Sequence, residues 1–108
     1  DERERLQQSL GGNKALILRN HGLLTTGRTV PEAFMRLYRL ERSAQVQIDA
    51  AAAGQLHVVG DNVAAHSRDG VESFIADGTQ NGGGLDYGRM EYAALMRKLD
   101  KTDTSYRD

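Results

Sequence analysis

The apolar positions along the chain follow two spacings, one typical of strands and one typical of helices. Residues 15–18 form an unbroken apolar run, Ala-Leu-Ile-Leu, and residues 23–26 continue with Leu-Leu-Thr-Thr. Short runs bounded by turn residues predict strands, and the first run is typical of a strand that is buried on both faces. Gly22 suits a bulge or a tight bend between the two strand segments.

The longest helical pattern follows these strands. Thr29 is a suitable N-cap, Glu32 lies three residues later and completes a capping box, and Pro31 is tolerated in the first turn. The helix is predicted to run from residue 30 to about residue 53, with an Ala-rich apolar face. Its length, on the order of 35 Å, exceeds what a small globule needs. We therefore expect it to pack against a sheet or another subunit.

The remaining chain is predicted to be mostly helical. Three further segments have helical spacing, namely residues 1–10, 61–78 and 86–101. Residues 56–59 predict a short extended piece, and the Asn-Gly-Gly-Gly stretch at 81–84 predicts a linker. A buried strand needs neighbours on both sides, and this chain supplies too few. We expect the partner strands to come from another part of a longer chain or from another subunit.

Composition narrows the class of protein. The 108 residues match one small domain, and 39% hydrophobic with 27% charged residues is typical of a folded soluble protein. Lys and Arg total 14 against 15 Asp and Glu, a net charge of -1, which argues against a nucleic-acid or anionic-membrane surface. Cysteine is absent, which excludes disulfides and thiolate sites and suits a cytoplasmic protein. No apolar run approaches the roughly 20 residues that cross a bilayer.

Histidines are the candidate groups for metal or acid–base chemistry. His21 stands at the end of an apolar strand, a place where ligands and catalytic groups occur in α/β folds. The alternative is a histidine that caps the strand through backbone hydrogen bonds. His57 and His66 fit no metal-pair spacing and are interpreted as partly exposed polar residues. Arg19 and Arg28 flank His21 and are candidates for holding an anionic group, although surface arginines are ordinarily solvated charges.

Other charged residues have structural interpretations. Glu32 and Arg36 are spaced i,i+4 and are interpreted as helix support. Glu41 interrupts the apolar face of the long helix, either as a buried partner for an arginine or at a subunit boundary. A catalytic zinc takes about three protein ligands, and the sequence offers one credible ligand, His21. No nucleophile elbow is present.

The segment 15–34 resembles the class II aldolase/adducin family. It combines an apolar strand, Asn-His-Gly at 20–22, a second strand, and a helix start reading Gly-x-Thr-Val-Pro-Glu-Ala-Phe at 27–34. The similarity continues through three more segments, at residues 40–45, 94–100 and 105–108. We therefore expect residues 1–108 to be the C-terminal portion of a single domain of this type, with the N-terminal half on a longer polypeptide.

The resemblance implies a fold and a metal site. The implied fold class is α/β, the C-terminal part of a three-layer α/β/α sandwich around a central, mostly antiparallel sheet, assembled as a homotetramer. His21 is implied to ligate a divalent metal, usually Zn²⁺. The family's other ligands, a His-x-His pair, and its acidic catalytic residue lie upstream and are not in this sequence, so the metal needs ligands outside the chain and no catalytic residue is assigned within it.

Two functions follow from the resemblance. The first is a metal-dependent lyase that acts on a small hydroxy-carbonyl, sugar-phosphate-like substrate through an enediolate. The alternative is a non-catalytic, adducin-like structural or interaction module. The retained His21 favours the enzyme, and the chain alone is expected to be catalytically silent because it lacks the other ligands. Aldol cleavage, epimerisation, dehydration and decarboxylation remain open as the reaction.

Overall fold

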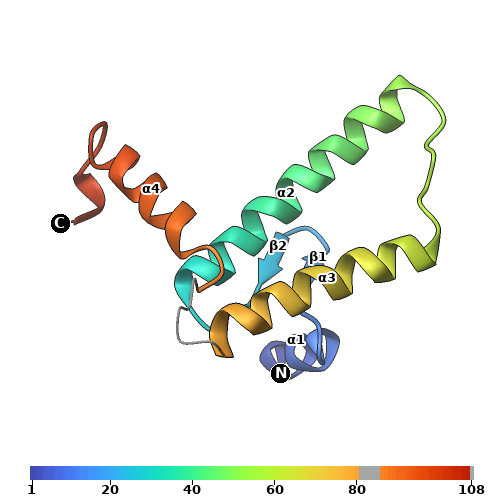
Figure 1. The fold of residues 1–108 in the computed structure, drawn as a ribbon, viewed down its shortest axis with the longest axis horizontal. Coiled ribbons are helices and arrows are strands. Elements are labelled where there is room, and N and C mark those ends of the chain that lie inside the picture. The colour runs from blue at the N-terminus through green and yellow to red at the C-terminus, as the bar shows by residue number, and fades with distance from the viewer. Residues whose placement is uncertain (81–85, 108) are drawn as a thin grey trace.

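A computed structural model describes residues 1–80 and 86–107. Over those residues it holds two strands, four α-helices and one short 3-10 helix (Figure 1). In chain order they are α1 (Glu2–Leu10), β1 (Ala15–Leu18), β2 (Gly22–Thr25), α2 (Val30–Ala53), α3 (Asp61–Gln80), α4 (Arg89–Leu99) and the 3-10 helix η1 (Ser105–Arg107). The predicted linker at 81–84 lies outside the described residues.

The two strands form an antiparallel hairpin. β1 and β2 pair in the register that sets Ala15 opposite Thr25 and Leu18 opposite Gly22. Gly22 has a φ of 120°, which confirms the predicted tight bend, and β2 begins at this glycine rather than after it. The prediction that β1 is buried on both faces is wrong for this chain. The side chain of Ile17 is 78% exposed, because β1 has one neighbouring strand among the described residues and no layer over that face.

The long helix has the predicted bounds. The Thr29 hydroxyl accepts a hydrogen bond from the Glu32 backbone N–H at 3.2 Å, which confirms Thr29 as the N-cap of α2. The second half of the predicted capping box is not formed. The Glu32 carboxylate instead accepts from the backbone N–H and the cationic Nε of Arg28 and pairs with Arg36, because hydrogen bonds between charged groups are stronger than neutral ones.

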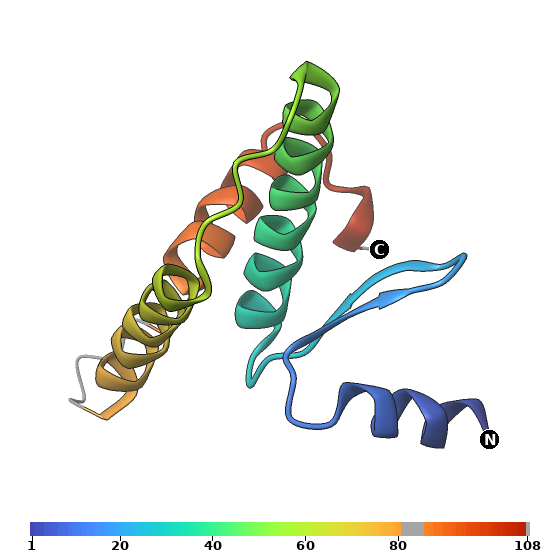
Figure 2. The ribbon, with the colours of Figure 1, turned by 90° about the vertical axis from the view of Figure 1, so that its right-hand side faces the viewer.

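Packing is concentrated at the N-terminal end of α2. This end contacts β2 on one side and α4 on another, and Figure 2 shows the hairpin extending away from it. The Thr25 hydroxyl donates to the Ala33 carbonyl at 2.9 Å, which ties β2 to the helix. The rings of Phe34 and Tyr92 meet edge to face, with centroids 5.3 Å apart, and join α2 to α4.

The C-terminal helices differ in their ends from the prediction. α3 runs two residues beyond the predicted end at Gly78, and α4 is shorter than the predicted 86–101. The segment 55–60 between α2 and α3 contains no strand, and Val58 in it is 83% exposed. After α4, the Arg107 guanidinium pairs with Asp100 at 2.6 Å, and the Tyr106 hydroxyl donates to the same carboxylate.

Little of the molecule is covered. Among the described residues, Met35 is the one buried apolar side chain and Glu32 the one buried charged side chain. The accessible surface is 8964 Å², against about 6,000 Å² for a compact monomer of this size. The radius of gyration is 16.8 Å, against about 13 Å for a compact chain. The chain is therefore mixed α/β with an open shape, and its described part does not form three layers.

The close approach of α4 to α2 needs a glycine, which gives a test of the packing. Gly88 has a φ of 82°, and a Cβ there would lie 2.6 Å from Met35 Cγ and 2.7 Å from the Pro31 carbonyl oxygen. We expect Gly88→Ala to lower the free energy of unfolding by about 2 kcal/mol or more, because backbone strain and steric clash add. Denaturant unfolding followed by circular dichroism measures this.

The matched control is Gly70→Ala within α3. Nothing lies within 4 Å of a Cβ built at Gly70, so alanine there gains helix propensity of up to about 1 kcal/mol. Equal effects of the two substitutions would contradict the α2–α4 contact.

Candidate functional site

His21 occupies the turn that joins β1 to β2. Its backbone N–H donates to the Leu18 carbonyl at 3.3 Å, so the turn is closed by the chain itself. Asn20 has a φ of 66° and Gly22 a φ of 120°, conformations that asparagine and glycine tolerate best. The hairpin pairing fixes both ends of this turn. The sequence Asn-His-Gly thus holds an imidazole at the tip of a sheet in a defined backbone conformation.

A hollow of about 370 Å³ lies beside the imidazole. It separates α1 from the hairpin turn, and its walls are Glu2, Arg5, Leu6, Ser9, Leu18, Arg19 and His21. His21 itself is exposed. The turn therefore presents this side chain to a space of small-molecule size.

The donors in this hollow do not make a complete metal site. A zinc ion takes about three protein ligands and one open position, whereas the hollow holds one imidazole and one carboxylate, that of Glu2. Over residues 1–80 and 86–107, no group of three His, Cys, Asp or Glu side chains is arranged to hold a metal. A metal bound through His21 would need ligands from beyond the described residues.

The other histidines lie elsewhere. His66 on α3 lines a second hollow, of about 750 Å³, together with the start of α4. His57 is an exposed residue between α2 and α3. The structure does not bring either residue to His21, in agreement with their interpretation as separate polar residues.

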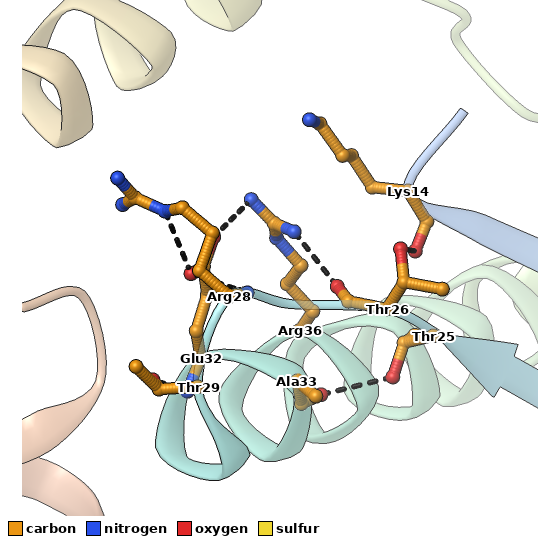
Figure 3. A network of polar contacts seen from close by, with 8 residues as sticks. All are labelled: Lys14, Thr25, Thr26, Arg28, Thr29, Glu32, Ala33 and Arg36. Atoms are coloured by element: carbon orange, nitrogen blue, oxygen red, sulfur yellow. Dashed lines mark hydrogen bonds and ion pairs between the residues drawn. The ribbon is translucent and has the colours of Figure 1, made fainter. Parts of the chain in front are cut away.

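Arg28 belongs to a different cluster from the one predicted. It lies at the β2–α2 junction, where the Glu32 carboxylate accepts from the Arg28 backbone N–H at 2.9 Å and from its Nε at 3.2 Å (Figure 3). The Arg36 guanidinium pairs with the other carboxylate oxygen at 2.6 Å and donates to the Thr26 carbonyl at 2.7 Å. The Glu32 side chain is 4% exposed. Arg28 is thus held away from His21 by Glu32.

Burial and cations act in opposite directions on the Glu32 carboxyl. Burial raises its pKa, but hydrogen bonds from Arg28 and the charges of Arg36 and Arg28 outweigh burial, and the net effect lowers the pKa below 4.5. Glu32 is therefore a structural anion at neutral pH. From the sequence, only the pairing of Glu32 with Arg36 was predicted. The arginines four residues before and four residues after Glu32 were the signal for a three-residue cluster.

Glu41 does not join this cluster. Its side chain is exposed on α2, so the interpretation as a buried partner for an arginine is wrong. An exposed glutamate on an otherwise apolar helix face is compatible with the other interpretation, a subunit boundary.

Comparison with known proteins places the chain among its relatives. The family model for the class II aldolase and adducin N-terminal domain matches residues 1–48. A Pseudomonas aeruginosa protein named for aldolase class 2 is 36% identical over 109 residues, which cover 99% of this chain and 40% of that protein. Gamma-adducin of Mus musculus is 32% identical over 122 residues, covering 99% of this chain and 17% of that protein. No solved structure matches the chain with significance.

The chain thus spans two-fifths or less of the length of these relatives. None of the helices in the described ranges combines the length and apolar character that a bilayer crossing requires.

Removing the negative charge of Glu32 should loosen the β2–α2 junction. We expect Glu32→Gln to lower the free energy of unfolding by about 2 kcal/mol at neutral pH, because Arg36, whose side chain is 15% exposed, loses its ion pair. Glu41→Gln on the same helix is the control and should stay within about 0.5 kcal/mol of the parent protein. Similar losses in the two variants would contradict the role of Glu32.

The Glu32 carboxylate should make the free energy of unfolding depend on pH in the acidic range. The pKa of Glu32 is lowered in the folded state, so its contribution is present above pH 4.5 and is lost as the pH falls through the folded-state pKa. The parent protein should therefore lose more stability than Glu32→Gln between neutral pH and mild acid. Unfolding midpoints measured across this range test the difference, and parallel pH profiles would contradict it.

Proposed function

Because the chain belongs to the class II aldolase/adducin family, we propose that it is part of a metal-dependent lyase of the class II aldolase type. The substrate is a small hydroxy-carbonyl compound, sugar-phosphate-like in chemistry. The observation that carries the proposal is the Asn-His-Gly turn, which presents His21 beside a hollow of about 370 Å³. A structural module has no evident need for an exposed imidazole there.

In this proposal His21 supplies one metal ligand. A neutral imidazole is the commonest metal-ligating side chain, and a turn closed by the Leu18 carbonyl holds it at one place. The remaining ligands come from residues outside the described chain. A divalent metal such as Zn²⁺ would act as a Lewis acid on the carbonyl oxygen of the substrate. Residues 1–108 alone would then be catalytically silent.

The proposed full domain is a three-layer α/β/α sandwich with a central, mostly antiparallel sheet, of which residues 1–108 form the C-terminal portion. The β1–β2 hairpin would be two strands of that sheet, and α2 would be part of one helical layer. Exposed Ile17 on β1 and exposed Phe74 on α3 support the proposal, because both would be covered by further strands or helices. A cytoplasmic location is also proposed, supported by the lack of cysteine.

An adducin-like structural or interaction module is the second candidate. It is favoured by the identity of 32% with gamma-adducin, which covers nearly all of this chain. The two candidates differ in whether His21 binds metal, so one measurement separates them.

The assembly is proposed to be a homo-oligomer, a tetramer by family resemblance. Support comes from the C-terminal half of α2, which extends from the body with Val46 66% and Ile48 65% exposed (Figure 1). A second copy packed along the face that carries Ile48 would remove this side chain from water, whereas Val46, two residues earlier, faces another side of the helix and would be covered by a different neighbour.

Replacing His21 tests whether this residue is a metal ligand. In the longer parent protein, we expect His21→Ala to remove nearly all bound divalent metal while the circular dichroism spectrum is retained, because the residue is exposed. Elemental analysis gives the metal content per chain. His66→Ala is the control and should keep the parent content. Stoichiometric metal in the His21 variant would reject this residue as a ligand, and a metal-free parent after exposure to zinc would favour the adducin-like module.

Self-association is tested separately. Val46 and Ile48, both exposed on α2, are changed together to Ser, and sedimentation of this variant is compared with that of the parent chain. We expect the parent to sediment as an oligomer and the variant to shift toward monomer, because apolar burial between copies is lost. Val58→Ser/Val59→Ser, in the segment between α2 and α3, is the control. A parent that remains monomeric at high concentration would contradict the proposal.

A further inference from the structure

The hollow beside His21 carries an excess of positive charge. Two arginines from different elements line it, Arg5 on α1 and Arg19 next to the hairpin turn, and Glu2 is the one carboxylate in its wall. Over the described part of the chain, no hydrogen bond or ion pair engages either guanidinium. Both guanidinium groups are therefore available to a ligand.

A second hollow lined by arginines is different. It lies at the β2–α2 junction, has a volume of about 440 Å³, and includes Arg28 and Arg36 in its wall. Glu32 already pairs with both of these arginines. Arg28 and Arg36 are thus engaged by an internal carboxylate, whereas Arg5 and Arg19 are not. The sequence had indicated Arg19 as a candidate for holding an anionic group, but it had not indicated Arg5.

We propose that this hollow binds the anionic group of a small molecule, a phosphate or a carboxylate, through Arg5 and Arg19. The guanidinium group is a planar fork that matches two oxygens of such an anion, and hydrogen bonds between charged groups are the stronger ones. Ser9, also in the wall, offers a hydroxyl donor. Arg5 stands on a helix capped by Asp1, and Arg19 stands in the hairpin turn directly after β1, where the His21 N–H to Leu18 carbonyl hydrogen bond closes the turn.

The position of the anion gives it a role. Because His21 shares the hollow with both arginines, an anion held there would place the rest of its molecule beside the imidazole. The role of this hollow as a substrate subsite rests on the proposed function, whereas binding of the anion itself requires no metal. Anion binding and the proposed lyase function can therefore be tested, and can fail, independently of each other.

The test is a titration of the chain with inorganic phosphate, at low ionic strength and with a chelator present. Nuclear magnetic resonance follows the His21 imidazole and the arginine side chains. We expect a saturable shift at these groups. Arg5→Gln/Arg19→Gln should bind phosphate about tenfold more weakly or worse, the loss expected for one or more charge-assisted hydrogen bonds. A retained circular dichroism spectrum shows that the variant is folded.

The matched control is Arg3→Gln/Arg89→Gln. It removes the same charge at two exposed arginines that do not line this hollow. Equal weakening in both double variants would mean a general charge effect and would overturn the proposal, as would a phosphate titration without saturation. Acetate titrated in parallel identifies the ligand source: tighter binding of phosphate assigns a phosphorylated ligand, and tighter binding of acetate assigns a carboxylate.

The metal content of the parent protein, measured separately, keeps the outcomes apart. Phosphate binding in a protein that takes up no metal supports the anion site and rejects the lyase. Metal uptake without phosphate binding supports the lyase and rejects the anion site.

Discussion

The junction between the hairpin and the long helix depends on the buried carboxylate of Glu32. Arg28 and Arg36 both contact this carboxylate. Arg36 also donates a hydrogen bond to the carbonyl of Thr26, the residue that follows β2. Because a buried charge that loses its partner costs several kcal/mol, the turn and the helix keep one arrangement. The direction of the hairpin from α2, and with it the location of His21 at the far end, follows from this cluster.

Beyond that junction the chain has a large surface that it does not cover itself. Met35 alone among the described apolar side chains is buried, and the accessible surface exceeds that of a compact monomer by roughly half. The apolar faces of β1, α2 and α3 have the composition of interior surfaces. A site built on such a scaffold is shaped partly by whatever packs against it, which explains why His21 has a hollow and two arginines but too few metal donors.

Local signals in the sequence predicted local structure well. Thr29 and Pro31 mark the start of α2, and Gly22 marks the bend of the hairpin, because caps and turns depend on neighbouring residues. Burial of β1 was not predictable, since it depends on strands that this chain does not provide. That Arg5 and Arg19 line the same hollow could not be predicted either, because it depends on how the segment between α1 and β1 orients α1.

The cluster around Glu32 joins residues that lie near one another in the sequence. Every contact from the Thr26–Lys14 pairing to the Arg36 ion pair falls within a short stretch of chain. Contacts of low sequence separation form fast because little loop entropy is lost. The hairpin and the first turns of α2 are thus expected to fold early and to form a nucleus on which the other elements of the domain pack, so that the His21 turn is formed before they dock.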